Sequence, residues 1–175
     1  MFLARKVSAP LWGAENDVAG DLSGDIAKEV FTKKNNLSFW RCRDASEVHG
    51  AALAIITAPA ATPEELWIVL VPEDQVAAVG AGFSETEGDT LVESLKSKHV
   101  NATNLSFGRL HSLAKRLAPL VRDIGQSCYL FTKPEVLELI FHAIENNQLQ
   151  ADRLSKPTKE ALGGNLAHLL AKRRS

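Results

Sequence analysis

One run of residues restricts the folds open to this chain more than any other feature. Residues 66–72 read LWIVLVP, a continuous apolar stretch rich in β-branched side chains. β-Branched residues favour strands, and a strand with one face in water would instead alternate apolar and polar side chains. The run therefore predicts a strand that is buried on both faces and needs packing partners on each side.

Further strands are expected in the first quarter of the sequence. Residues 2–7 alternate well enough for an edge strand, which Pro10 then ends. The stretch EVFTKKNNLSFWRC, residues 29–42, predicts a hairpin whose turn is residues 33–36, because asparagine tolerates the left-handed conformation of tight turns. Side chains of its second strand alternate between two faces: Leu37, Phe39 and Arg41 on one, and Ser38, Trp40 and Cys42 on the other. Neither face is wholly polar, so partial cover on both sides is expected.

Capping signals predict the helices. Asp44-Ala45-Ser46-Glu47 is a capping box, in which the Asp44 side chain accepts the N–H of residue 47 and Glu47 reaches back to residue 44. Apolar residues then recur at helical spacing over residues 48–56, and Pro59 ends that helix. Similar signals predict further helices at residues 73–79 and after Asp89, Ser106, Thr132 and Ser155. Residues 127–131 (SCYLF) are expected to form a short strand.

The predicted strands lie mainly in the first half of the chain and the helices in the second. We therefore expect an α+β fold: a mixed β-sheet built mainly from the N-terminal half with helices packed on it, and a mostly helical C-terminal half. The length of 175 residues fits a single globular domain, residues 1–175. Residues 156–175 are expected as a basic C-terminal helix, either within the domain or as an appendage to it.

Two hexamers are nearly identical. Residues 36–41 read NLSFWR and residues 104–109 read NLSFGR. Their flanking residues diverge at once, and the first is expected to end a hairpin strand while the second caps a helix. We interpret the match as coincidence, with a duplicated half-domain as the alternative.

Charge is unevenly distributed. Residues 1–100 carry 9 Lys/Arg and 15 Asp/Glu, residues 101–149 carry 5 and 4, and residues 150–175 carry 6 and 2. The chain thus has an acidic body and a basic end within a net charge of −1. Such an end can contact an acidic partner or nucleic acid, but packing against its own acidic half is the default expectation.

Several classes of protein find no support in the sequence. The longest nearly apolar stretch, residues 51–61, is too short to cross a bilayer, and no export signal is visible. Cys42 and Cys128 have no metal-ligand spacing and are expected as buried thiols of a cytoplasmic protein, with a bridge between them only if their strands are neighbours. No phosphate-binding glycine motif occurs, since residues 80–82 (GAG) lack the third glycine, so no cofactor is predicted.

Glu73 and Asp74 are the best enzyme-like feature. They follow the buried strand directly, and ligands of open α/β sheets bind beyond the carboxyl ends of strands. Carboxylates there would hold Mg²⁺ or act as a base in a small metal-dependent hydrolase or nuclease. The simpler interpretation is that they complement the dipole of the helix that begins there.

A second candidate lies on the helix after Thr132. Glu138 and His142 are four residues apart and share a helix face with Glu135 and Glu145, a spacing that allows metal ligation. No second helix offers a matching pair. A solvated polar face explains the pattern equally well.

Two basic groups are the candidates for nucleic-acid contact: Arg109, Lys115, Arg116 and Arg122, and then Lys156, Lys159, Lys172, Arg173 and Arg174. A pI near 6.5 argues against a dedicated nucleic-acid-binding protein. Weak binding of nucleic acid is kept as an alternative function.

Binding is the leading expectation for function. Trp40 with Arg41 and Arg43 resembles an interface cluster in composition, although a strand tryptophan is more often core and the two arginines are expected to be exposed. With Lys172, Arg173 and Arg174 these arginines are the predicted binding residues. We expect a non-enzymatic cytoplasmic accessory protein that contacts a protein partner or a second copy of itself through charged surfaces.

Overall fold

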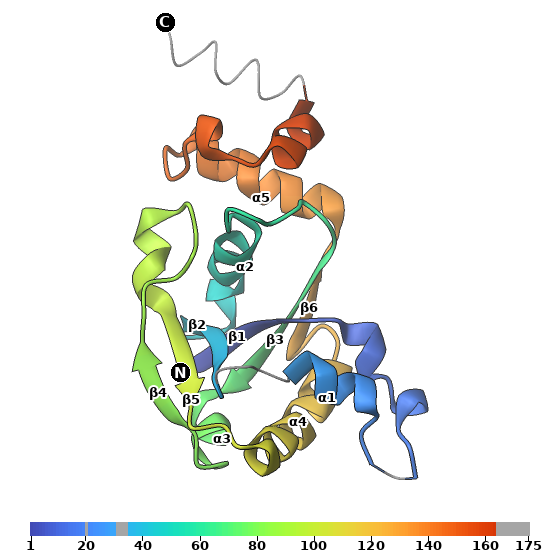
Figure 1. The fold of residues 1–175 in the computed structure, drawn as a ribbon. Helices are drawn as coiled ribbons and strands as arrows, with labels where there is room; N and C mark the ends of the chain where they lie inside the picture. Colours follow the sequence, from blue (N-terminus) through green and yellow to red (C-terminus); the bar gives the residue numbers. More distant parts are fainter. Residues whose placement is uncertain (20, 31–34, 164–175) are drawn as a thin grey trace, which may run out of the picture.

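A computed structural model describes residues 1–19, 21–30 and 35–163 of the chain (Figure 1). Six strands form one sheet in the order β4-β5-β2-β1-β3-β6. The strands are β1 (Phe2–Val7), β2 (Leu37–Cys42), β3 (Leu66–Pro72), β4 (Gly82–Glu85), β5 (His99–Thr103) and β6 (Cys128–Phe131). The main helices are α1 (Gly24–Val30), α2 (Val48–Ile56), α3 (Glu73–Ala77), α4 (Phe107–Arg122) and α5 (Lys133–Glu145). The α+β class predicted from the sequence is confirmed.

The sheet differs from the expectation in its pairing. All five pairings between these strands are antiparallel, so the sheet is not mixed. The predicted edge strand is also wrong, because β1 lies at the centre, with Leu3 opposite Arg41 of β2 on one side and Val71 of β3 on the other. β2 and β3 run in the same direction, but β1 lies between them. The two strands that α2 connects are therefore not paired with each other.

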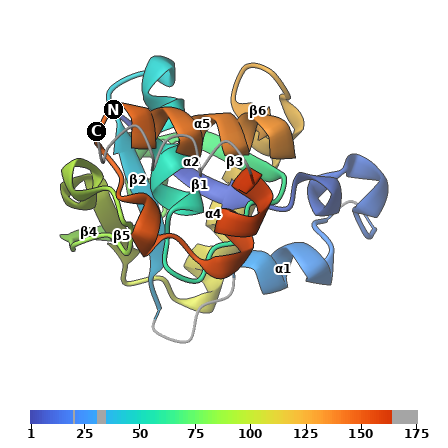
Figure 2. The ribbon, with the colours of Figure 1, turned by 90° about the horizontal axis from the view of Figure 1, so that it is seen from above.

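Helices cover both faces of the sheet. Figures 1 and 2 show α2 and α5 on one face, and Figure 1 shows α1, α3 and α4 on the other. The prediction that residues 66–72 are buried on both sides is confirmed, since Ile68 and Leu70 pack with α2 and α5 while Val69 and Val71 pack with α4. The same alternation holds in β2, where Phe39 belongs to the α4 side.

The predicted hairpin before β2 is wrong. Glu29 and Val30 end helix α1 instead of forming a strand, and residues 31–34 lie outside the described part. Tertiary contacts favour the helix: Ile26 and Val30 are buried against the α4 layer. The Glu29 carboxylate also accepts the indole N–H of Trp12 at 2.6 Å.

The capping signals of the second half are confirmed. Ser106 accepts the N–H of Arg109 at the start of α4, and Thr132 forms a capping box with Glu135 at the start of α5. The signal at Asp89 is wrong, because residues 93–98 form a 3₁₀ turn whose N-cap residue is Val92. The sequence also missed β4 and β5, whose short sequences GFSE and HVNAT contain too few apolar residues to stand out.

The two hexamers fold differently. Residues 37–41 belong to β2, whereas Asn104 adopts a left-handed conformation (φ 60°) just before the Ser106 cap. The chain ends its described part in a helix at residues 156–163, which lies over α5 in Figure 1 and buries Leu162. None of the helices in the described ranges is long and apolar enough to cross a membrane.

Candidate functional site: a groove lined by histidine and glutamate

A groove on the α5 side of the sheet collects four ionisable side chains from two helices. Its lining consists of His49 from α2, Glu135, Glu138, Leu139 and His142 from α5, and Tyr129, Leu130 and Phe131 from β6. The groove holds about 730 Å³, counted with its solvent-open mouth. The sequence alone did not connect His49 with α5, because the two are brought together only by packing on the sheet.

The start of α5 fixes the position of Glu135. Its Oε2 atom accepts the backbone N–H and the hydroxyl of Thr132, each at 2.7 Å. These hydrogen bonds, the hydroxyl first, lower the pKa of Glu135, so the carboxylate stays negatively charged at neutral pH. The helix then presents Glu138 and His142 on the same side, three and seven residues further along.

His49 enters the groove from the first turn of α2. Its ring meets the ring of Phe131 edge to face, with centroids 5.4 Å apart and planes at 87°. This contact is typical of aromatic pairs and holds the imidazole beside the end of β6. The attraction between His49 and Glu135 is one of the causes of the lowered pKa of that carboxyl group.

His142 lies between two carboxylates of its own helix. Its Nε2 is 3.5 Å from Glu138 Oε1, and its Nδ1 is 3.1 Å from Glu145 Oε2. The side chains of Glu138 and His142 are 68% and 58% exposed. Within residues 1–19, 21–30 and 35–163, no three His, Cys, Asp or Glu side chains are grouped so that they could hold a metal ion. The side chains of the predicted pair Glu138 and His142 therefore lie close together, but the described residues provide no third metal ligand beside them.

The environment of the groove suits attraction of cations better than proton transfer. General acids and bases are usually tuned by burial, whereas Glu138 and His142 are more than half exposed to water. Glu135 is engaged in capping the helix. No lysine or arginine in the described part of the chain forms an ion pair with Glu135 or Glu138.

Glu73 and Asp74 lie outside this groove. Both belong to the first turn of α3, as the simpler interpretation predicted. Glu73 Oε1 is 3.4 Å from Arg41 Nη2, while Asp74 is exposed. A ligand site of this kind needs neighbouring strands whose carboxyl ends meet at one edge of the sheet, and the antiparallel neighbours of β3 do not provide such an edge.

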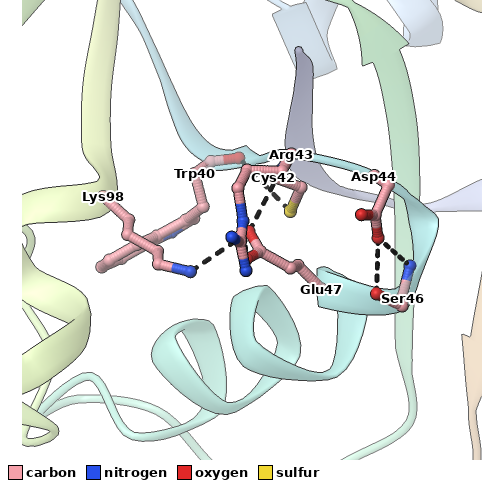
Figure 3. A network of polar contacts seen from close by, with 7 residues as sticks. All are labelled: Trp40, Cys42, Arg43, Asp44, Ser46, Glu47 and Lys98. Atoms are coloured by element: carbon pink, nitrogen blue, oxygen red, sulfur yellow. Dashed lines mark hydrogen bonds and ion pairs between the residues drawn. The ribbon is translucent and has the colours of Figure 1, made fainter.

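The interface-like cluster around Trp40 is largely structural. Trp40 is buried, as the core interpretation predicted. Arg43 is exposed, but its guanidinium is bound to Glu47 (Figure 3). Arg41 was expected to be exposed, but its side chain is only 26% exposed and lies between the carboxylates of Glu73 and Glu85. The hydrogen bond that Arg41 donates to Glu85, at 2.7 Å, is the main cause that raises the pKa of Arg41.

Most of the predicted basic group on α4 is already engaged within the protein. Arg109 donates to the carbonyl oxygen of Asn104 at 2.8 Å. Lys115 is 3.2 Å from Asp21, and Arg122 is 2.6 Å from Asp17. In the C-terminal group, Lys156 pairs with Glu160 and Lys159 donates to the carbonyl oxygen of Asp152. The candidates Lys172, Arg173 and Arg174 lie outside the described residues.

The two cysteines are far apart in the sheet. Cys42 in β2 faces the α2 layer, and Cys128 in β6 faces the α4 layer, with β1 and β3 between their strands. Both are free buried thiols, and burial raises the pKa of each to about 11. A disulfide between them is therefore excluded in this fold.

The whole chain was compared with protein-family models, curated proteins and solved structures. No protein-family model, no curated protein and no solved structure matches it. The geometry of the groove is therefore the basis for assigning a function.

Proposed function

We propose that this chain is a non-enzymatic cytoplasmic binding protein whose acidic groove takes up a positively charged segment of a protein partner. One observation carries the proposal: Glu135 and Glu138 line an open groove with His49 and His142, and no lysine or arginine of the described residues pairs with either carboxylate. The free thiols Cys42 and Cys128 support a reducing compartment.

The walls of the groove suit a lysine or arginine side chain. Such a side chain has an apolar stem and a charged head. Phe131 and Leu139 offer apolar contacts for the stem, Tyr129 offers an aromatic ring, and the two glutamates attract the head. A protein segment that carries several cations would also be steered to this face by its charge.

Neither alternative has an observation in its favour. A metal-dependent hydrolase would need Glu73 to be available, but Arg41 lies against it. A nucleic-acid-binding surface would need several free cations on α4, but three of the four predicted there, Arg109, Lys115 and Arg122, are engaged, and Arg116 is exposed. Both alternatives therefore rank behind binding of a basic protein segment.

The test uses the full chain and two matched peptides. One is a short capped peptide with three arginines, and in the other each arginine is replaced by the neutral isostere citrulline. We expect the arginine peptide to shift the NMR signals of His49, Phe131 and Glu138, and its affinity to fall as salt is added. Equal affinities for the two peptides, or shifts confined to other parts of the surface, would refute the proposal.

A charge-neutral variant localises the effect. Glu138→Gln removes one carboxylate and leaves the Thr132 capping box intact. We expect it to lower the affinity for the arginine peptide by about three- to tenfold, the contribution of one charge-assisted contact. Glu87→Gln is the control, since Glu87 is exposed and does not line the groove. If the two variants have the same effect, net charge explains the binding and the groove does not.

A further inference from the structure

The groove reaches the outer edge of the sheet. β6 is the last strand in the strand order, and its inner edge pairs with β3. Leu130 of this strand lines the groove together with Tyr129 and Phe131. The backbone on the outer edge of β6 is therefore within reach of a segment that enters the groove.

The backbone groups of β6 alternate in direction. In an antiparallel pair, every second residue exchanges both of its hydrogen bonds with the neighbouring strand, and the residues between them point away from it. Cys128 points away from β3, because its N–H donates to the carbonyl oxygen of Asp123 and its own carbonyl oxygen accepts the N–H of Gly125. Leu130, two residues further on, therefore also directs its N–H and carbonyl oxygen outward.

These two groups of Leu130 have no hydrogen-bond partner among the residues that the structure describes. The edge is closed on either side of them. The turn before β6 covers Cys128, while Thr132 donates its N–H to Glu135 and accepts the N–H of Val136. The open part of this edge is thus one residue long, which is enough for a short peptide contact and too short for another sheet to continue the strand order.

The side chains at this edge divide between two faces. Cys128 packs in the α4 layer, and Leu130 shares that face by alternation. Leu130 is 37% exposed, and Ile124, which forms an isolated bridge to Cys128, is 62% exposed. Phe131 turns to the other face, where α5 and the groove lie. The edge therefore has an apolar face and an acidic face.

An extended segment that bonds to Leu130 divides its own side chains in the same way. Its residue opposite Leu130 shares the face of Leu130 and Ile124, whichever direction the segment runs. The residues before and after that residue turn into the groove, about 6–7 Å apart. Glu135 and Glu138 have a similar spacing, about 5–6 Å between their Cβ atoms. The edge therefore fits the order cation, apolar residue, cation.

We propose that the basic segment binds in an extended conformation at the edge of β6, with its central apolar residue paired to the backbone of Leu130 and its two flanking cations beside Glu135 and Glu138. This inference rests on the proposed function, because it specifies the segment that the same groove takes up. The backbone hydrogen bonds contribute affinity, and the alternation of side chains gives specificity.

Two capped peptides of identical composition test the alternation. One reads Gly-Arg-Leu-Arg-Gly and the other Gly-Arg-Arg-Leu-Gly. Only the first can direct two arginines into the groove at once, so we expect it to bind the full chain about three- to tenfold more tightly, the contribution of one charge-assisted contact. Equal affinities of the two peptides overturn the proposal.

The N–H of Leu130 reports the pairing directly. With the alternating peptide at ten times its Kd, we expect exchange of this N–H with water, measured by NMR, to slow about tenfold, because only the free fraction of the protein exchanges. An unchanged exchange rate at that concentration overturns the pairing.

Methylation of single peptide nitrogens gives the direction of the added segment. The central leucine donates to the Leu130 carbonyl oxygen in an antiparallel pair, and the following arginine donates in a parallel pair. We expect methylation of one of these two nitrogens to weaken binding by about three- to tenfold, and methylation of the first glycine nitrogen to leave it unchanged. No loss from either of the two overturns the proposal.

Failure of this inference can be told apart from failure of the proposed function. If the peptide with three arginines shifts the signals of His49 and Glu138 while the Leu130 N–H stays unprotected, the groove takes up basic segments and only the strand pairing is wrong. If no arginine peptide shifts those signals, the proposed function and this inference are both wrong.

Discussion

Glu47 holds both the backbone and the side chain of Arg43. Its Oε2 accepts the Arg43 backbone N–H at 3.0 Å, and its Oε1 accepts Arg43 Nε at 2.7 Å (Figure 3). Lys98 donates a further bond to Oε2 at 3.2 Å. The sequence predicted instead that Glu47 would reach back to residue 44. The observed bonds tie the end of β2 to the start of α2 and to the residue before β5.

The first prediction concerns the pH dependence of this contact. The bonds from Arg43, its backbone N–H first, and then from Lys98 lower the pKa of Glu47 to about 2 from an ordinary value of 4.5. Because the folded pKa lies below the unfolded one, the carboxylate stabilises the fold above about pH 4.5, and this stabilisation is lost as the pH falls toward 2. We expect Glu47→Gln to lower the free energy of unfolding by about 1 kcal/mol at pH 7 and by much less near pH 2.5.

Urea titrations of wild type and variant at both pH values measure this difference. Glu64→Gln is the control, since the Glu64 side chain is 64% exposed and lies 3.5 Å from Lys133. We expect the control to change the free energy by less than about 0.5 kcal/mol. A Glu47→Gln effect of equal size at the two pH values would contradict the assignment.

The second prediction compares two glycines. A Cβ at Gly88 would collide with Cη2 of Trp40 and lie 2.7 Å from its Cζ3 and 2.9 Å from the Cβ of His99. Gly108, in the first turn of α4, has nothing within 4 Å of the same position. We expect Gly88→Ala to destabilise the fold by about 1–3 kcal/mol and Gly108→Ala to stabilise it by about 0.5 kcal/mol. Thermal and urea unfolding of both variants measure these changes in stability. A Gly88→Ala variant as stable as wild type would mean that the packing around Trp40 is loose.

The third prediction concerns Arg41, which separates the carboxylates of Glu73 and Glu85. Removing the guanidinium leaves two like charges without their partner, so Arg41→Ala is expected to lower the free energy of unfolding by about 1–2 kcal/mol. A double-mutant cycle with Glu73→Gln is expected to give a coupling energy of about 1 kcal/mol. Additive effects in that cycle would show that the 3.4 Å contact contributes nothing.

The fourth prediction concerns the cysteines. Cys42 and Cys128 are buried, and burial raises the pKa of each thiol to about 11. We expect a thiol reagent at pH 8 to label fewer than one cysteine per native chain within minutes and both cysteines in urea. Mild oxidation should leave the chain without an internal disulfide. Rapid labelling of the native chain would show that one of the two strands opens readily.

Much of the local structure was readable in the sequence. The strand at residues 66–72, the caps at Ser106 and Thr132 and the two faces of β2 depend on side chains that act on their own backbone or on close neighbours. The hairpin before β2 failed for the opposite reason. Ile26 and Val30 form a helix because their contacts lie in the α4 layer, far away in the sequence.

The candidate groove was readable only in part. The face of α5 that carries Glu138 and His142 follows from helical spacing, and the sequence singled it out. His49, Tyr129 and Phe131 carry no local sign that they line the same groove. Their proximity depends on how α2 and α5 pack on the sheet.

The sequence by itself determined which segments are strands or helices wherever the deciding contacts lie within a few residues. The tertiary structure alone decided that β1 lies between β2 and β3, that the sheet is antiparallel, and that His49 lines the same groove as α5. The physical reason is that strand pairing uses backbone groups common to every residue. The order of strands is therefore set by which apolar faces are buried together, and those faces come from distant parts of the chain.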